Sequence, residues 1–287
     1  MTTISSDTSM EENIALNDGN MMPRLGFGVW QIGKGQTESL VSSAIAAGFR
    51  HIDTAQAYYN EAGVGRAVQN VSVPRENLFV TSKLRGRDMG YDAAMRSFDE
   101  TMERMELDYL DLFLIHWPMP AQDLYVETWE ALIKLRTAGR VRSIGVSNFT
   151  AAHIDRLVQA TGVTPAVNQL EIHPFFQQQG IRDHHKQLGI VIESYSPLGG
   201  NHGGVLHNDV VQSIAAKHDR TPAQIVLRWH LQQGLVPLPK TATATRLPEN
   251  LAVRDFELDE NDMLQLFRLD RPHGNTQPLP DDMNSSF

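Results

Sequence analysis

Four side chains of types that move protons lie near the ends of three apolar segments in the first half of the chain. Asp53 and Tyr58 fall in HIDTAQAYYNE, Lys83 follows LFVTS, and His116 follows DLFLI. Such a set suits proton transfer from a phenol to a carbonyl oxygen. A free tyrosine has a pKa of about 10, and Lys83 would lower it by ~2 units for roughly 2.7 kcal/mol of interaction. We expect Asp53 to hold Lys83, and His116 to orient the carbonyl.

Each of these residues also has an explanation without function. Asp53 could cap a helix, Tyr58 could lie on the surface, Lys83 could be a solvated lysine, and His116 could be a core histidine bonded to the backbone. One such coincidence is common. Four of them at the same ends of successive strands are hard to attribute to packing, so the functional interpretation is favoured.

Segments with strand character alternate with segments of helical spacing along most of the chain. We expect eight strands, at residues 25–27, 49–53, 78–81, 110–116, 143–146, 166–171, 191–195 and 235–239. Parallel strands need crossover helices, and eight of them close without edges, so the expected fold class is α/β, a (β/α)8 TIM barrel. The site is expected at the C-terminal ends of its strands. Asn-Asp-Gly at 17–19 predicts an N-terminal β-hairpin.

Several helices are marked by their spacing and their ends. One apolar stripe predicts a core-facing helix that begins near Asp92, and it contains Met95, Phe98, Met102 and Met105. The segment 125–138 is expected to stop at Gly139. Thr221, followed by proline and then Gln224, predicts a capping box. A doubly wound sheet is the alternative fold, but its glycine fingerprint is incomplete in both GFGVWQ and GVGRAV.

Length and composition limit the class of protein. The 287 residues are 41% apolar, enough for one barrel or two ordinary domains, and no apolar run reaches the roughly 18 residues of a membrane span. We expect a loose tail at 1–12 without a signal peptide, then a single domain at 13–287. The net charge of −9 disfavours nucleic acid as a partner. The absence of cysteine excludes disulfides and thiolate chemistry and favours the cytoplasm.

Polar and basic residues follow the later strands. Donors and acceptors that suit a carboxamide end the fifth and sixth strands, at Ser147, Asn148 and Gln169. Tyr195 offers a flat face for a ring, and the glycines of PLGGNHGG let a backbone approach phosphates closely. An anion site is predicted at the helix start after the eighth strand, at Lys240, Thr241 and Arg246.

With these residues in place, the chain from about 13 to 270 resembles the aldo-keto reductase superfamily. The bacterial branch that includes the 2,5-diketo-D-gluconate reductases is the part of the family that it resembles. The matching stretches are LGFGVW, GFRHIDTAQAYYNEAGVGRAV, LFVTSK, LDYLDLFLIHWP, VRSIGVSNF, TPAVNQLEIHP, SYSPLG and PKTATATRLPEN. The resemblance implies a barrel that binds NADPH across its C-terminal mouth and reduces aldehydes or ketones, among them α-dicarbonyls, keto sugars and small aldehydes.

The resemblance also implies roles for individual residues. Tyr58 would be the general acid, assisted by Asp53, Lys83 and His116. The nicotinamide end of the cofactor would contact Ser147, Asn148, Gln169 and Tyr195. The 2′-phosphate would be held by Lys240, Thr241 and Arg246, and the adenine by Glu249 and Asn250. Further cofactor contacts would come from Thr54, Ser196, Leu198 and Gly199. The substrate pocket would be formed by Trp30, Tyr59 and Trp117, with a loop from the C-terminal residues 271–287.

Two positions depart from the family pattern. Tyr59 stands where glycine is frequent, and we expect it to narrow the pocket beside the acid. Thr243 stands where close relatives carry arginine, so phosphate binding is expected to depend on Lys240 and Arg246.

Two other functions stay open. Lys83 could form a Schiff base in a barrel aldolase, although pairing with Asp53 would keep it protonated. A non-catalytic barrel could instead bind nucleotide as a redox-sensing or structural subunit. No metal is expected, because five histidines lack ligand spacing: His173, His184, His185, His202 and His207. We expect His184 and His185 on a solvated helix face. The expected protein is a monomer with a small carbonyl substrate and neither nucleic acid nor membrane as partner.

Overall fold

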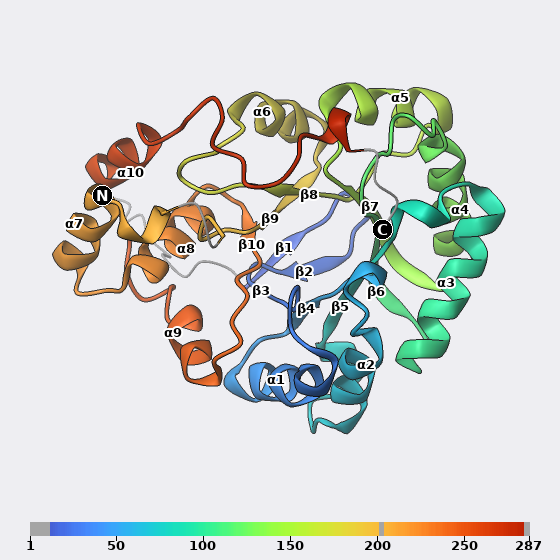
Figure 1. Cartoon of the computed structure of the whole chain (residues 1–287), viewed down its shortest axis with the longest axis horizontal. Helices are drawn as coiled ribbons and strands as arrows, with labels where there is room; N and C mark the ends of the chain where they lie inside the picture. The colour runs from blue at the N-terminus through green and yellow to red at the C-terminus, as the bar shows by residue number, and fades with distance from the viewer. Residues whose placement is uncertain (1–11, 201–203, 284–287) are drawn as a thin grey trace, which may run out of the picture.

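Parallel strands form the centre of the molecule, and helices surround them (Figure 1). The computed structural model describes residues 12–200 and 204–283. Eight strands pair in chain order: β3 (Gly26–Gly28), β4 (His51–Asp53), β5 (Phe79–Leu84), β6 (Leu110–Ile115), β7 (Val141–Ser147), β8 (Val167–Glu171), β9 (Val191–Tyr195) and β10 (Val236–Pro237). The Gly28 N–H donates to the Pro239 carbonyl at 3.1 Å, which brings β3 beside β10. The expected TIM barrel is confirmed.

The helices that cover the barrel follow the strands in alternation. They are α1 (Lys34–Ala47), α2 (Glu61–Asn70), α3 (Tyr91–Met105), α4 (Tyr125–Thr137), α5 (Ala151–Thr161), α6 (Gln179–Leu188), α7 (Asp209–His218), α8 (Pro222–Gln232), α9 (Leu247–Leu251) and α10 (Glu260–Phe267). The predicted stripe on α3 is buried at Phe98, Met102 and Met105. Gly139 follows α4 with φ +72°, and Thr221 and Gln224 form the predicted capping box of α8.

The predicted N-terminal hairpin closes the end of the barrel at which the strands begin. Strand β1 (Asn13–Ala15) pairs antiparallel with β2 (Met21–Pro23). Leu16 and Met22 are buried against the first residues of the barrel strands, among them Val167 and Val236. The hairpin therefore plugs the amino-terminal end and leaves the carboxyl ends of the strands as the open face. Glu12, which pairs with Arg254 at 3.0 Å, is the described part of the expected tail, and residues 1–11 lie outside the described residues.

One strand end differs from the prediction in a way that concerns the site. The sequence predicts that the third strand ends at residue 81, but β5 continues to Leu84. The strand is longer because its polar residues find partners inside the fold. The Ser82 hydroxyl donates to Glu61 at 2.6 Å, and Lys83 Nζ donates to Asp53 at 2.7 Å. Lys83 therefore belongs to the barrel wall and not to the loop after it.

The prediction that both His184 and His185 lie on a solvated face of α6 is wrong for His185. His184 is partly exposed, with Nε2 2.9 Å from Asp155. His185 is fully buried, and its Nε2 lies 2.7 Å from the side-chain nitrogen of Asn168 on β8. Consecutive residues point in directions about 100° apart around a helix, so the two rings cannot share one environment.

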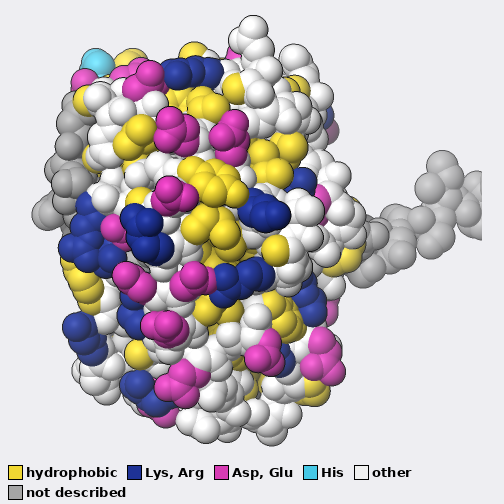
Figure 2. All heavy atoms as spheres, turned by 90° about the vertical axis from the view of Figure 1, so that its right-hand side faces the viewer, with side chains coloured by type: hydrophobic (Ala, Val, Ile, Leu, Met, Phe, Trp, Pro, Cys, Tyr) yellow, Lys and Arg dark blue, Asp and Glu magenta, His cyan; other side chains and the backbone are white. Residues whose placement is uncertain are grey.

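The outer face over α3, α4 and α5 carries charges of both signs interspersed with apolar side chains (Figure 2). Arg104 pairs with Glu100 at 3.4 Å on α3, and Arg140 pairs with Asp99. Exposed pairs of this kind add little stability. Within residues 12–200 and 204–283, no helix combines the length and the apolar character that crossing a bilayer requires.

Candidate active site

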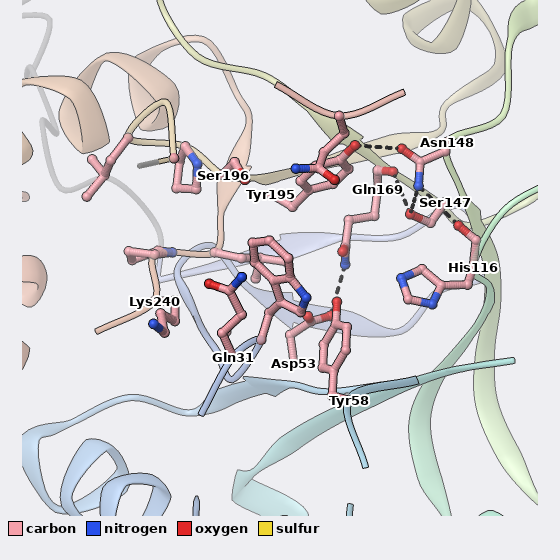
Figure 3. Close-up of a pocket in the computed structure, with 18 of the residues that line it drawn as sticks. Gln31, Asp53, Tyr58, His116, Ser147, Asn148, Gln169, Tyr195, Ser196 and Lys240 are labelled. Atoms are coloured by element: carbon pink, nitrogen blue, oxygen red, sulfur yellow. Dashed lines mark hydrogen bonds between the residues drawn. The ribbon is translucent and has the colours of Figure 1, made fainter. Parts of the chain in front are cut away.

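A cavity of about 840 Å³ opens at the carboxyl ends of the strands (Figure 3). The predicted site residues that line it are Trp30, Asp53, Tyr58, His116, Trp117, Ser147, Asn148, Gln169, Tyr195, Ser196, Leu198 and Lys240. The other predicted residues do not line it: Thr54, Tyr59, Lys83, Gly199, Thr241, Arg246, Glu249 and Asn250. One face of the barrel thus collects side chains that are more than 200 residues apart in the chain.

The Asp53–Lys83 pair lies in the floor of this cavity. Lys83 is fully buried, and its Nζ donates to the two Asp53 oxygens at 2.7 and 2.8 Å and to the Thr54 carbonyl at 2.8 Å. Burial alone would lower the pKa of Lys83, but the charges of Asp53 and Tyr58 outweigh it and raise that pKa above its ordinary value. A lysine that keeps its proton and three partners is poorly suited to form a Schiff base, which argues against the aldolase interpretation.

Tyr58 ends a short 3₁₀ turn (Gln56–Tyr58) that follows β4, and its half-buried ring lines the cavity. Lys83 Nζ lies 5.3 Å from the ring centroid. The sequence-based expectation of a lowered phenol pKa is wrong in sign. Burial raises the pKa of Tyr58 above 10, and Lys83 only opposes that rise, because Asp53 compensates the lysine charge. The phenol is therefore fully protonated at neutral pH.

His116 lies beside Tyr58 at the end of β6. The two ring centroids are 5.7 Å apart, and the ring planes meet at 75°. Burial, followed by the charge of Lys83, holds the pKa of His116 well below its usual value. The imidazole is therefore neutral near pH 7, and in that state it can hydrogen-bond a carbonyl oxygen without competing with Tyr58 as the proton donor.

A network of hydroxyl and amide groups forms the next part of the wall (Figure 3). Asn148 Nδ2 donates to Ser147 Oγ at 3.0 Å and to the His116 carbonyl at 3.1 Å, and the Tyr195 hydroxyl donates to Asn148 Oδ1 at 2.9 Å. Asn148 has φ +61° and Ser196 has φ +46°. Left-handed backbone at non-glycine residues is strained and is typical of functional sites.

The opposite end of the cavity carries a lysine. Lys240 lines it, at a distance from His116 across the whole cavity (Figure 3), and Gly200 and Gly204 form part of its wall with φ +58° and +64°. Amide groups and a tyrosine ring at one end, with a lysine and glycine backbone in the rest of the wall, fit an extended dinucleotide such as NADPH.

The residues that the resemblance implies for binding the adenine and the 2′-phosphate follow Lys240 in the chain. Arg246 is exposed in the turn Ala244–Arg246, and the buried Thr241 hydroxyl donates to the Thr243 carbonyl at 3.2 Å. Glu249 accepts a hydrogen bond from the Thr221 hydroxyl at 2.7 Å, which ties α9 to α8. Asn250 is buried, so only its edge could meet a ligand.

Several residues of the site were missed by sequence reasoning. Gln31 and His207 line the cavity, and so do Gln277 and Met283, which were expected only as unspecified members of the C-terminal loop 271–287. Gln31 directly follows Trp30, and an amide beside a predicted pocket residue could have been noticed. Gln277 and Met283 carry no local signal, since they reach the cavity through tertiary contacts. Glu193, fully buried inside β9, was also missed, although an acid within VIESY was visible as an anomaly.

The histidines considered as metal ligands are scattered in the fold. His173 pairs with Glu171 at 3.2 Å, His207 lines the cavity, and His202 lies outside the described residues. In the part of the chain that the structure describes, no three His, Asp or Glu side chains gather as the ligands of a metal ion would.

A comparison with known protein families agrees with this site. Residues 24–271 match the Aldo/keto reductase family. The chain belongs to the aldo/keto reductase family. As a member of that family it is an oxidoreductase, and the resemblance identified in the sequence is confirmed.

Similar aldo/keto reductases are found among bacterial and insect proteins. An aldo-keto reductase of Mycolicibacterium smegmatis is 48% identical over 91% of this chain and 94% of its own length. Methylglyoxal reductase DkgA of Escherichia coli is 45% identical over 90% and 93%. A mutant of Gox0644 solved in complex with NADPH has a TM-score of 0.90 and 45% identity over 94% and 98%. The Bombyx mori enzyme with NADP has a TM-score of 0.84 and 34% identity over 90% and 92%.

Proposed function

We propose that this enzyme is an NADPH-dependent reductase of small aldehydes and ketones, with α-dicarbonyls and keto sugars among its substrates. The observation that carries the proposal is that Tyr58 and His116 line one cavity directly beside the buried Asp53–Lys83 pair. The similarity to a methylglyoxal reductase, which is named for an α-dicarbonyl, supports the substrate class. The similar structures that hold NADPH or NADP support the cofactor.

Tyr58 is the general acid in this proposal. The hydride for the carbonyl carbon is what NADPH supplies when bound. The Tyr58 O–H bond breaks as the new O–H bond of the alcohol forms, and the phenolate left behind is stabilised by the Lys83 ammonium. His116, neutral because of its lowered pKa, orients the carbonyl oxygen by a hydrogen bond. Tyr58 regains its proton from water at the open mouth.

The remaining residues divide between cofactor and substrate. Carboxamide contacts are proposed for Ser147, Asn148 and Gln169, with the ring stacked on Tyr195. Contacts farther along the cofactor are proposed for Thr54, Ser196, Leu198, Gly199, Lys240, Thr241, Arg246, Glu249 and Asn250. The substrate pocket is assigned to Trp30, Tyr59 and Trp117. We also propose a monomer of one domain (13–287) that acts in the cytoplasm, in keeping with a chain without cysteine.

The test is a panel of carbonyl substrates with NADPH and NADH in parallel, followed by the loss of near-ultraviolet absorbance. Turnover of α-dicarbonyls with NADPH is expected. Tyr58→Phe should abolish turnover and leave NADPH binding, measured by fluorescence, unchanged. Tyr91→Phe, at an exposed tyrosine on α3 outside the cavity, is the matched control and should keep full activity. Full activity in Tyr58→Phe would exclude the assigned acid, and no turnover by the unmodified enzyme would exclude the function.

A further inference from the structure

A buried carboxyl group that the proposed mechanism does not use lies inside the barrel below the cavity. Glu193 is in the middle of β9, is fully shielded from solvent, and is the register partner of Gln169 on β8. A carboxyl group in such a place costs several kcal/mol unless hydrogen bonds or charges compensate it. Its contacts therefore indicate what it does.

One amide nitrogen connects Glu193 to the catalytic pair. Gln169 Nε2 donates to Glu193 Oε2 at 2.7 Å and to Asp53 Oδ2 at 2.9 Å. Asp53 in turn accepts both of its remaining short bonds from Lys83 Nζ. An amide NH₂ has two hydrogens, so Gln169 can serve both carboxyl groups at once only in this orientation. Hydrogen bonds therefore connect Glu193 continuously to Lys83 through Gln169 and Asp53.

The interior of the barrel holds few charges besides these. β4 contributes His51 and Asp53, and β5 contributes Lys83. On the paired strand β8, Glu171 is held by His173 and Thr276, and the neighbouring β10 contributes only the apolar Val236 and Pro237. His51 Nε2 lies 3.4 Å from Glu193 Oε1 and 3.2 Å from the Thr81 hydroxyl. Burial lowers the pKa of His51 to about 4, so the ring is neutral near pH 7. One lysine therefore faces two carboxyl groups.

This imbalance decides the proton state of Glu193. Burial raises the pKa of Glu193 to about 8, and the negative charge of Asp53 adds to the rise. The hydrogen bond from Gln169 and the positive charge of Lys83 limit it. Near pH 7 the carboxyl is therefore neutral, and Lys83 is balanced by Asp53 alone. Above pH 8 a second anion adds to the field at Lys83 and opposes the ionisation of Tyr58.

We propose that Glu193 is a positioning residue that fixes Gln169 and the Asp53–Lys83 pair and, once ionised, weakens the support that Lys83 gives to the Tyr58 phenolate. The inference rests on the proposed reductase function. Glu193 touches neither substrate nor cofactor, and it acts in two ways. The hydrogen bond to Gln169 controls geometry, and the charge controls the pH at which Tyr58 loses its proton.

The experiment compares Glu193→Gln, which keeps an acceptor for Gln169 but cannot ionise, with Glu193→Met, which removes both. Glu127→Gln, at an exposed glutamate on α4, is the control. Infrared difference spectroscopy of the cofactor-free protein should show a protonated carboxyl that titrates near pH 8 in the unmodified enzyme and in the control, and is absent from Glu193→Gln. In the alcohol-oxidising direction, the rise of kcat with pH should move to lower pH by roughly half a unit in Glu193→Gln. Glu193→Met should lose about tenfold in kcat at every pH.

The outcomes separate the inference from the proposed function. If the enzyme is active and the pH profile of Glu193→Gln overlies that of the unmodified enzyme, Glu193 is merely structural and the inference fails. The absence of a carboxyl that titrates near pH 8 would also overturn it. If the unmodified enzyme reduces no carbonyl at all, the proposed function fails and the inference fails with it. Should Glu193→Met not fold, Glu193→Gln still decides, because its side chain has nearly the same size.

Discussion

The behaviour of the Asp53–Lys83 pair at the scale of single residues follows from its burial. Both side chains are almost fully shielded, and three hydrogen bonds hold the ammonium. Such a pair adds little net stability over apolar residues, but removal of one partner leaves an uncompensated charge in the interior. Replacing only one of the two residues should therefore destabilise the fold. The role of the pair is better explained by its effect on Tyr58, whose ring Lys83 faces.

Lys83→Met should accordingly destabilise the enzyme by roughly 3–5 kcal/mol in urea unfolding, because Asp53 stays buried without a cation. Asp53→Asn combined with Lys83→Met should recover a large part of that loss and stay inactive. Lys134→Met, at an exposed lysine on α4, should change stability by no more than about 0.5 kcal/mol. A double variant as unstable as the single one would contradict the explanation by charge.

Tyr59 combines a strained backbone with a position directly after Tyr58. Its backbone is left-handed, with φ +56° and ψ +26°, its side chain is 55% exposed, and Lys34 Nζ lies 5.7 Å from its ring centroid. This left-handed conformation favours glycine over any residue with a side chain. A side chain there costs about 1–2 kcal/mol of backbone strain.

Tyr59→Gly and Tyr59→Ala both remove the ring. They differ only in the Cβ atom, which alanine keeps and which strains a left-handed backbone. We expect the glycine variant to be more stable than the alanine variant by about 1 kcal/mol, measured by urea unfolding. Both variants should accept bulkier carbonyl substrates, with a lower KM, since the ring no longer narrows the rim. Equal stability of the two variants would show that the left-handed conformation stores no strain.

At the scale of elements, the C-terminal segment 271–283 is held across the cavity by one buried acid. Glu171, at the end of β8, accepts from the Thr276 N–H at 2.8 Å, from its hydroxyl at 2.5 Å and from the Gln277 N–H at 3.1 Å. Burial would raise the pKa of Glu171, but the hydrogen bonds from His173 and Thr276 lower it. The segment crosses the barrel between α6 and α5 (Figure 1) and so brings Gln277 to the cavity.

Glu171→Gln should loosen this segment, because an amide NH₂ cannot accept from the Gln277 N–H. Gly274→Ala should do the same by another route, since its methyl group would lie 1.8 Å from the Phe175 carbonyl oxygen. We expect kcat/KM for carbonyls to fall about tenfold, equivalent to about 1.4 kcal/mol, and the Kd for NADPH to change less. Gly180→Ala, where a methyl group has open space, is the control. Unchanged kinetics in both variants would exclude a role for the segment in substrate binding.

Particular elements show how far the sequence could predict this structure. Alternating strands and helices, the capping box of Thr221 and the Asn-Asp-Gly turn are local signals, and each of the corresponding elements is present. The position of Gln277 depends on Glu171 more than 100 residues away, and no local pattern reports that contact. The pKa of Tyr58 was predicted with the wrong sign because the degree of burial, which outweighs the charge of Lys83, is a property of the assembled cavity.

At the scale of the whole molecule, buried titratable groups set the range of pH in which the barrel is stable. Burial lowers the pKa of His51, His185 and His230 to about 4, against 6.5 in an unfolded chain. Between these values the unfolded chain binds up to three more protons, so acid removes stability. Glu193 acts in the opposite direction, since its pKa rises from 4.5 to about 8 and its stabilising contribution is lost as the pH rises.

These four groups together predict a maximum of stability near pH 6.5 to 7. Between pH 4.5 and 6.5 the difference for these four groups is three protons minus one, which lowers the free energy of unfolding by about 2.7 kcal/mol per pH unit on acidification. His116, whose pKa is also held well below its usual value, adds to this fall. Between 6.5 and 8 only Glu193 remains, and stability should fall by about 1.4 kcal/mol per unit as the pH rises. Urea unfolding from pH 5 to 9 measures both slopes. Glu193→Gln should remove the alkaline decline and steepen the acid limb, because among these four groups it deletes the one that binds its proton more tightly in the folded state. A variant that leaves the alkaline slope unchanged would mean that the carboxyl inside the barrel is already ionised at neutral pH, and that Lys83 balances two anions instead of one.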